Sequence, residues 1–284
     1  MIRLRVMELF DIGVNLAKSH FDRDRDQVVA RAKRAGVTRM ALTGVDGPGS
    51  AASADLAARL GFVSTAGVHP HHAERWDEDA PLVRALLARP EVRAVGECGL
   101  DLERAYAPRD AQIRAFEAQL RLAADLGLPL FLHQRGAEAL FCRMLAAMGR
   151  DLPRATLHCF TGGEALLETC LELGLSFGVT GWICDERRNA ELVRLIGRIP
   201  AGRLMLETDA PYLFPRSMPR TDAGGPRRAR NEPANLVWIA QETARLRGER
   251  PEALAAATFA AAEAFFAPSG PAAPQPRNHE EEAR

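Results

Sequence analysis

The chain alternates short apolar stretches with segments of helical character, and eight such pairs follow one another along the sequence. Short apolar stretches that alternate with helices are typical of a parallel sheet. Eight units favour a closed (β/α)8 TIM barrel, an α/β fold, over an open doubly wound sheet. No Gly-x-Gly-x-x-Gly follows the first expected strand, which weakens the open-sheet alternative. The expected strands are residues 9–16, 39–43, 63–68, 92–97, 128–133, 155–160, 175–180 and 203–208.

The length of the chain suits a single barrel. The sequence has 284 residues, of which 47% are hydrophobic, and barrels of about 250 residues commonly form one domain. We therefore expect one domain over residues 8–266, after an N-terminal extension at residues 1–7. Residues 267–284 are rich in Pro and Ala and then acidic, which predicts a disordered tail. The expected helices are residues 23–35, 51–60, 81–88, 109–126, 137–149, 163–173, 187–198, 232–247 and 251–265.

Charge and composition limit the surroundings in which the chain can work. The formal net charge is zero, so whole-molecule attraction to nucleic acid or to an anionic membrane is not indicated. The sequence contains no apolar run of the roughly 18 residues that a membrane span needs, and its N-terminus lacks the apolar region of a signal peptide. Five cysteines without a CxxC motif suit a reducing compartment. We expect a cytoplasmic protein.

Four of the expected strands have a residue type that binds metals at or near their C-terminal end. These residues are Glu97, His133, His158 and Asp209. In a barrel the C-terminal ends of the strands meet at one face, where functional groups gather. A carboxylate at the mouth of a buried strand is unfavourable unless a positive charge meets it. A single histidine after a strand is more often structural, but the same pattern on four strands is hard to explain by packing alone.

Two imidazoles and two carboxylates form a mixed nitrogen and oxygen site that suits Mg²⁺, Mn²⁺ or Zn²⁺. Such an ion lowers the pKa of a bound water molecule and polarises a substrate oxygen. Asp209, on the last strand, is the candidate general base because it can reach both the ion and the water. His69 and His71 follow the third expected strand and lie at the same face.

Several motifs together resemble the TatD family of metal-dependent deoxyribonucleases, over about residues 8–266. The motifs are Phe10-Asp11-Ile12-Gly13-Val14-Asn15-Leu16, Gly67-Val68-His69-Pro70-His71, Gly96-Glu97-Cys98-Gly99-Leu100-Asp101, Leu157-His158-Cys159-Phe160-Thr161-Gly162, Leu206-Glu207-Thr208-Asp209-Ala210-Pro211-Tyr212 and Arg230-Asn231-Glu232-Pro233. The resemblance implies a TIM-barrel metallohydrolase that removes nucleotides from DNA as a 3′→5′ exonuclease with Mg²⁺. It implies a single-stranded DNA end as the substrate, with RNA as a further candidate, and we expect a monomer with no membrane partner.

The resemblance also assigns roles to residues. It implies that Glu97, His133 and His158 are metal ligands and that Asp209 is a ligand or the catalytic acid and base. We count Glu97 as catalytic together with Asp209. His69 and His71 fall in a motif on the substrate side, which implies contact with phosphate, and Arg135 is a further substrate-binding candidate.

The chain departs from the family pattern in two places. The wider family opens with His-x-His on the first strand, where this chain has Gly13 and Asn15. With two imidazoles fewer, the site should favour hard ions such as Mg²⁺ or Mn²⁺ over Zn²⁺. In the second departure, Gly136 stands in the motif after His133 where an acidic residue is expected.

Side chains around the expected site could bind a polynucleotide. An Arg-rich solvated loop is an equally ordinary explanation for the arginines, and capping of the barrel core is the commoner explanation for the aromatic residues. The arginine candidates are Arg135, Arg216, Arg220, Arg227, Arg228 and Arg230, and the aromatic candidates are Phe160, Trp182, Tyr212 and Phe214. Two other functions stay open: a hydrolase of a small ester or amide, and a metal-binding accessory protein without turnover. The second would not need a general base.

Overall fold

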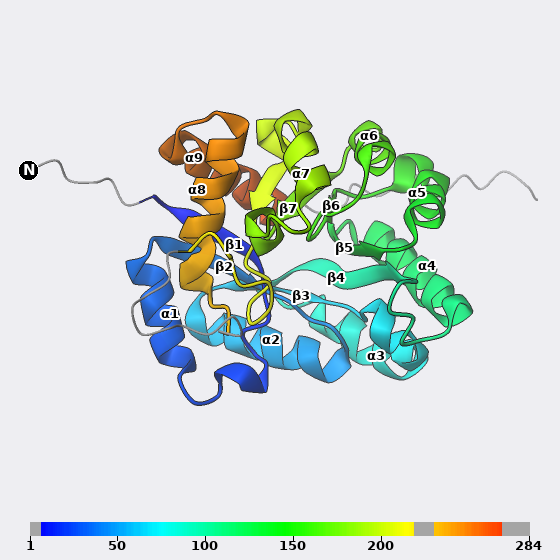
Figure 1. Cartoon of the computed structure of the whole chain (residues 1–284). Helices are drawn as coiled ribbons and strands as arrows, with labels where there is room; N and C mark the ends of the chain where they lie inside the picture. Colours follow the sequence, from blue (N-terminus) through cyan, green and yellow to red (C-terminus); the bar gives the residue numbers. More distant parts are fainter. Residues whose placement is uncertain (1–6, 219–229, 269–284) are drawn as a thin grey trace, which may run out of the picture.

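Eight parallel strands close into a barrel in sequence order in the computed structural model of this chain (Figure 1), which describes residues 7–218 and 230–268. The barrel closes where Asp11 of the first strand pairs with Leu206 of the last. The expected barrel is thus confirmed and the open sheet is excluded. The strands are β1 (Leu9–Val14), β2 (Val37–Leu42), β3 (Val63–Ala66), β4 (Val92–Asp101), β5 (Leu130–Arg135), β6 (Ala155–Leu157), β7 (Ser176–Val179) and β8 (Leu204–Leu206).

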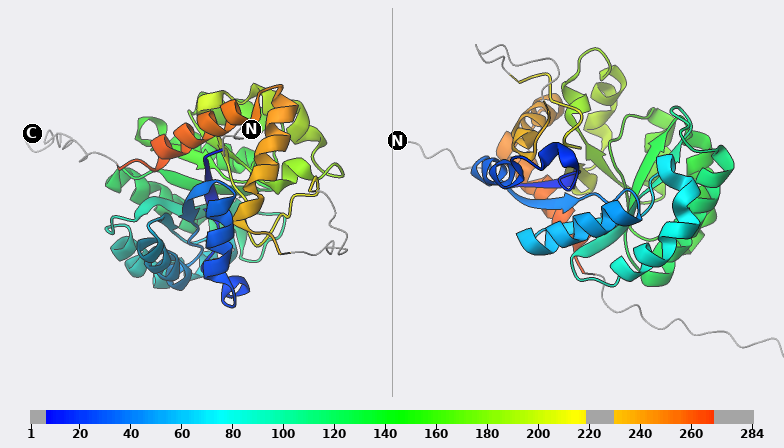
Figure 2. Two further views of the ribbon diagram at one scale, coloured as in Figure 1. Left: turned by 90° about the vertical axis from the view of Figure 1, so that its left-hand side faces the viewer. Right: turned by 90° about the horizontal axis from the view of Figure 1, so that it is seen from below.

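The helices form an outer ring around the strands, as the two further views show (Figure 2). The α-helices are α1 (Arg25–Arg34), α2 (Gly47–Leu60), α3 (Trp76–Leu86), α4 (Arg109–Leu126), α5 (Glu138–Ala147), α6 (Glu164–Glu172), α7 (Ala190–Leu195), α8 (Leu236–Arg247) and α9 (Pro251–Phe266). The short 3-10 helices are η1 (Ser19–Phe21), η2 (Pro70–Arg75), η3 (Gly149–Asp151), η4 (Gly181–Cys184), η5 (Ile196–Arg198), η6 (Ala201–Arg203) and η7 (Pro233–Asn235). The expected extension and tail fall almost entirely outside the described residues.

Three helices differ from their expected bounds for local reasons. Helix α2 begins four residues early because the carboxylate of Asp46 caps it by accepting the backbone N–H of Gly49. Helix α3 begins at Trp76, with acidic residues in its first turn, and it contains Pro81, which the sequence suggested as its start. Helix α7 is short because the carboxylate of Asp185 accepts hydrogen bonds from Arg187 and Arg188 and so holds these residues in a turn.

Strand β4 continues well past Glu97, and the expectation that this residue ends the strand was wrong. The pairing of β4 with β5 shifts between Val95 and Cys98, so β4 has one extra residue there. Such a bulge re-aims a side chain. Gly96 occupies the bulge with φ +148°, and a Cβ on it would lie 2.3 Å from the carbonyl oxygen of Phe131. Only glycine fits at this position, directly before the buried carboxylate of Glu97.

The hydrophobic core leaves just one end of the barrel for a site. Large side chains fill the half of the barrel at the N-terminal ends of the strands, and Phe265 and Phe266 of α9 close that end. The ring of Phe266 stacks on Phe10 of β1 at 5.5 Å between ring centroids. A larger cluster packs the helices against the outside of the strands. Among the described residues, no helix is both long enough and apolar enough to cross a bilayer.

Candidate metal and catalytic site

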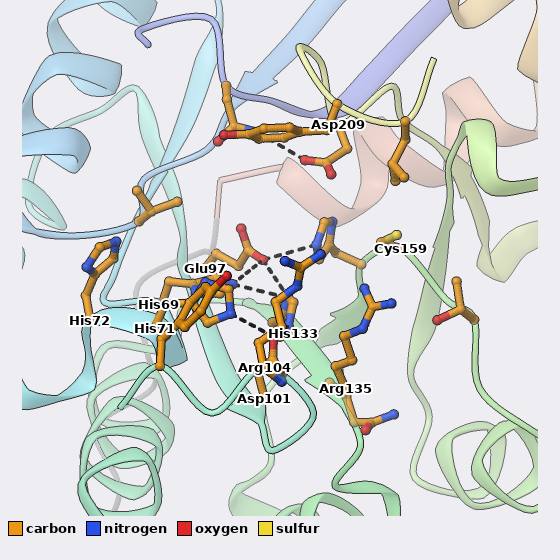
Figure 3. Close-up of a pocket in the computed structure, with 18 of the residues that line it drawn as sticks. His69, His71, His72, Glu97, Asp101, Arg104, His133, Arg135, Cys159 and Asp209 are labelled. Atoms are coloured by element: carbon orange, nitrogen blue, oxygen red, sulfur yellow. Dashed lines mark hydrogen bonds and ion pairs between the residues drawn. The ribbon is translucent and has the colours of Figure 1, made fainter. Parts of the chain in front are cut away.

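The C-terminal end of the barrel holds a cavity of about 370 Å³, which is at the lower end of the range for small-molecule sites. Its walls come from the ends of the strands and the loops that follow them (Figure 3). The cavity is lined by the expected metal-binding residues Glu97, His133, His158 and Asp209 and by the expected substrate-binding residues His69, His71 and Arg135. Its charged and histidine side chains are Lys18, His69, His71, His72, Glu97, Asp101, Arg104, His133, Arg135, His158 and Asp209.

Three imidazoles converge on one carboxylate oxygen. The Oε1 atom of Glu97 lies 2.9 Å from His133 Nδ1, 3.1 Å from His158 Nε2 and 3.3 Å from His69 Nε2. Figure 3 shows the dashed lines that meet at Glu97, with Asp209 on one side of this carboxylate and Asp101 on the other. The barrel thus brings four histidine and glutamate side chains from β4, β5 and the ends of β3 and β6 to a single point.

The donor set fits a divalent cation. Glu97, His69 and His133 each offer one ligand atom, and these atoms all lie within 4.8 Å of one another. Three ring nitrogens that compete for one oxygen need positive charge, either as protons on the rings or as a bound cation. The buried Nε2 of His133 has no hydrogen-bond partner. His69, expected on the substrate side, therefore belongs to the group that can hold a metal.

The ionisation of the group reflects this mutual attraction. Burial acts to raise the pKa of Glu97, but the positive charges and hydrogen bonds of the imidazoles outweigh it and hold that pKa well below its usual range. Burial acts to lower the pKa of His158, but attraction to Glu97 and Glu207 raises it well above its usual range. Burial lowers the pKa of His69 to about 4. His69 therefore presents a neutral ring, the form that binds metals.

A second carboxylate, Glu207, fixes the orientation of His158. Its Oε2 lies 3.1 Å from His158 Nδ1, and its Oε1 accepts the backbone N–H of Cys159 at 2.5 Å. Glu207 is completely buried. With Nδ1 engaged by this carboxylate, His158 can point the lone pair of Nε2 into the cavity. The sequence analysis did not single out Glu207, although it lies two residues before Asp209, and alternate residues of a strand share a face.

Asp209 stands apart from the imidazole cluster. Its Oδ1 accepts a hydrogen bond from Asn15 Nδ2 at 3.0 Å, and its backbone has φ +51°, an uncommon conformation that marks functional sites. Burial and the negative charge of Glu97 raise its pKa to about 7, against the attraction of His158. A carboxyl group that titrates near neutral pH suits an acid or base in catalysis.

Asp101 is a further participant that the sequence analysis did not assign. Its Oδ2 lies 2.7 Å from His71 Nε2 and 3.5 Å from His133 Nε2. Burial acts to raise the pKa of Asp101, but the His133 ring 3.5 Å away and the hydrogen bond with His71 hold that pKa well below its usual range. The carboxylate thereby ties His71 to the cluster. Its position in the sequence could have indicated this role, because Asp101 ends the same strand that carries Glu97.

Only some of the arginine and aromatic candidates line the cavity. Arg135 lines the cavity, pairs with Glu103 at 3.0 Å, and lies 5.6 Å from the centre of the Trp182 ring. Arg230 instead pairs with Asp24, outside the cavity lining. Arg216 lies 3.6 Å from Asp185, and three further candidates lie outside the described residues: Arg220, Arg227 and Arg228. Phe160 is buried, with 1% exposure, so it packs in the core, which was the commoner of the two explanations for these aromatic residues.

Comparison with known proteins gives consistent matches across the chain. The family described as "TatD related DNase" matches residues 10–267. The "3'-5' ssDNA/RNA exonuclease TatD" of Erwinia billingiae is 53% identical over 250 residues, which are 87% of this chain and 94% of that protein. The protein of the same name from Erwinia amylovora is 50% identical over 262 residues, 91% of this chain and 99% of its own length.

Solved structures share the fold. The TatD homologue YJJV of Escherichia coli K12 aligns with a TM-score of 0.81 and 26% identity, over 92% of this chain and 98% of its own. A hydrolase of the same family from Entamoeba histolytica aligns with a TM-score of 0.82 and 23% identity, over 93% of this chain and 99% of its own. The barrel and its order of strands are therefore common to these proteins.

Proposed function

This chain belongs to the family of TatD-related DNases, and from that membership we propose that it is a metal-dependent 3′→5′ exonuclease on single-stranded DNA and RNA. The single observation that carries the proposal is the convergence of His69, His133 and His158 on Glu97 in a cavity that also holds Asp209. Relatives of about 50% identity over most of the chain are named as such exonucleases. A metal-binding accessory protein would not need a general base, which is the further role proposed for Asp209.

We propose that Glu97, His133, His158 and Asp209 hold the metal, and that His69 adds a fifth ligand. A bound divalent cation would supply Lewis acidity to a phosphate oxygen and lower the pKa of a water molecule. Mg²⁺ remains our proposed ion because three carboxylates face the cavity. The nitrogen of His69 makes Mn²⁺ its nearest competitor, since Mn²⁺ accepts imidazole as well as carboxylate.

Other steps of the proposed reaction, proton transfer and phosphate binding, are assigned to side chains of the cavity. Asp209 accepts a proton from the attacking water, whose oxygen forms the new bond to phosphorus, and Asn15 holds the carboxylate in place. The bond between phosphorus and the 3′ oxygen of the neighbouring nucleotide breaks, and that oxygen leaves as a hydroxyl group with a proton from solvent, while Asp209 returns its own proton to solvent. Arg135 and the partly exposed His71 line the same cavity, where their positive or donor groups can bind phosphate.

We further propose that residues 8–266 act as one domain and as a monomer. All five cysteines are free thiols, which suits the reducing cytoplasm as the place of action.

A labelled oligonucleotide tests the proposed function. Purified protein is incubated with 3′-labelled and 5′-labelled single strands of DNA and RNA, each with Mg²⁺, Mn²⁺, Zn²⁺ or EDTA. The expected result is metal-dependent shortening from the 3′ end, absent in EDTA and in Asp209→Asn. If no strand is cut with any metal, the exonuclease proposal is wrong, and small ester and amide substrates become the next candidates.

A further inference from the structure

The two tyrosines of this chain both lie at the mouth of the cavity. The sequence contains only Tyr106 and Tyr212, and both line the cavity that contains Glu97. Tyr106 is 65% exposed and Tyr212 is 43% exposed. The other exposed large apolar side chains in the described part of the chain, Leu82 and Leu126, lie away from it. Exposed aromatic surface is thus concentrated where the substrate must bind.

Packing does not account for this exposure. Large aromatic side chains usually bury their rings, and the two tyrosines instead leave much of their surface to solvent. The ring of Tyr106 is held edge-on by His71, at 4.6 Å between ring centroids. The hydroxyl of Tyr212 accepts a hydrogen bond from Lys18 at 3.0 Å. His20 also lies edge-on to the Tyr212 ring, at 6.2 Å between ring centroids, and Lys18 Nζ lies 5.0 Å from the centre of that ring. Polar neighbours therefore hold each ring in place and still leave much of it exposed.

Positive side chains accompany these rings. Lys18, Arg104 and Arg135 line the same cavity. A ligand that pairs with cations and also covers flat aromatic surface carries phosphates and planar rings, as a nucleotide does. Trp182 is less available for such contact, because two guanidinium groups lie over its ring, that of Arg188 at 4.1 Å and that of Arg135 at 5.6 Å from the ring centre. The Tyr212 ring has one such cation, Lys18 Nζ at 5.0 Å.

We propose that Tyr106 and Tyr212 are the nucleobase-stacking surfaces of the site and receive the unpaired bases next to the scissile phosphodiester. The inference rests on the proposed function and extends it to the way in which a strand end is recognised. Tyr212 follows Asp209 by three residues, and its backbone N–H donates to the Asp209 carbonyl at 3.0 Å. Tyr106 contacts the histidine that Asp101 ties to the cluster. A base stacked on either ring therefore lies beside the reacting groups.

The proposal predicts two features of the substrate preference. A base in a duplex already has neighbours on both faces, so a stacking site favours a single-stranded end. Every base has a π-face, and stacking therefore selects little among sequences. The site should accept any terminal base and should act more slowly on a strand that ends in abasic units.

The test compares strands that differ only in their terminal bases. One oligonucleotide carries ordinary bases at its two 3′-terminal nucleotides, and the other carries abasic tetrahydrofuran units there. Initial rates are measured for the unaltered protein and for Tyr106→Ala, Tyr106→Phe, Tyr212→Ala and Tyr212→Phe. Leu82→Ala, which removes exposed apolar surface on α3 away from the cavity, is the matched control.

On the ordinary strand we expect each alanine variant to lose about tenfold in kcat/KM, each phenylalanine variant to stay close to the unaltered protein, and Leu82→Ala to be unaffected. On the abasic strand the alanine variants should equal the unaltered protein, because no base remains to stack. A separate binding assay uses a strand with 2-aminopurine at its 3′ end. Its fluorescence should be quenched on binding and should recover in the alanine variants alone.

The outcomes separate the two proposals. If the unaltered protein shortens the strands but the alanine variants lose the same factor on ordinary and abasic strands, stacking is wrong and the exonuclease function stands. Alanine variants with unchanged rates and unchanged quenching would overturn stacking in the same way. If the unaltered protein cuts no strand with any metal, the proposed function falls and this inference falls with it.

Discussion

Replacement of Glu207 by glutamine tests whether metal affinity depends on the orientation of the His158 ring and not only on the presence of this ring. Glu207 is buried and accepts two hydrogen bonds, one from the His158 ring and one from the Cys159 backbone. Glutamine has nearly the same shape but only one oxygen. One of the two donors must therefore face its NH₂ group.

Each orientation of the new amide has its own cost. If the NH₂ faces the Cys159 N–H, a buried donor is left unpaired, at a cost of roughly 1–3 kcal/mol in stability. If the NH₂ faces His158 Nδ1, the ring must carry its proton on Nε2, the atom 3.1 Å from Glu97 Oε1, and Nε2 can then no longer offer a lone pair to a metal. Loss of such a supporting partner lowers metal affinity by about 10–100-fold.

Three measurements on Glu207→Gln distinguish these cases. Titration calorimetry with Mn²⁺ gives the change in affinity, and urea unfolding of the metal-free protein gives the change in stability. Long-range ¹H–¹⁵N correlation spectra of the His158 ring report which nitrogen carries the proton. Glu172→Gln, at an exposed position of α6, is the control. If Mn²⁺ affinity and stability are both unchanged and the proton stays on Nδ1, the reasoning from hydrogen bonds to tautomer is refuted.

Four further perturbations test other parts of the structure. His69→Ala should weaken Mn²⁺ binding by more than about tenfold in calorimetry, because His69 is one of the three residues with clustered ligand atoms. If its effect on Mn²⁺ affinity is no larger than that of His20→Ala, His69 is not a metal ligand. Gly13→Ala should lower metal affinity as Glu207→Gln does, since the new Cβ would lie 2.3 Å from Glu207 Oε2, and unchanged affinity would mean that Glu207 can move freely. Phe266→Ala should lower the free energy of unfolding by about 3 kcal/mol with metal affinity unchanged, as urea unfolding and calorimetry can show, and a normal stability would contradict the role of α9 in closing the barrel. Asp24→Asn should lower the free energy of unfolding by roughly 1 kcal/mol at pH 7, because hydrogen bonds from Arg230 and Arg31 lower the pKa of Asp24 to about 2. The stability that Asp24 contributes is present above its ordinary pKa of 3.8 and is lost as the pH falls to 2. Urea unfolding that shows an equal effect of the substitution at pH 2 and pH 7 would contradict this.

The fold was predictable because each signal was local and repeated. The alternation of apolar and helical segments located all eight strands, and the errors fell at boundaries that side chains decide. The start of α2 depends on the cap from Asp46, and the length of α7 depends on hydrogen bonds to Asp185. Such hydrogen bonds are formed only once the chain has folded, so periodicity alone cannot reveal them.

The sequence predicted part of the lining of the cavity but not the contacts within it. The ends of the strands named Glu97, His133, His158 and Asp209, and the structure brings them to one cavity. The sequence could not tell that His69 turns its Nε2 towards Glu97, because that depends on the path of the loop after β3. It could not rank the aromatic candidates either, since the burial of a ring is set by neighbours that are distant in sequence.

The departure at Gly13 has a physical explanation in Glu207. The Oε2 atom of Glu207 lies where a side chain at position 13 would begin, and its Oε1 lies 2.5 Å from the place of a Cβ on Gly178. Two glycines on β1 and β7 therefore make the room in which this carboxylate binds His158 Nδ1. A histidine at position 13, as in the wider family, cannot coexist with Glu207 in this conformation. The chain thus lacks an imidazole that would enter the cavity from β1 and has a buried carboxylate that orients the imidazole at the end of β6.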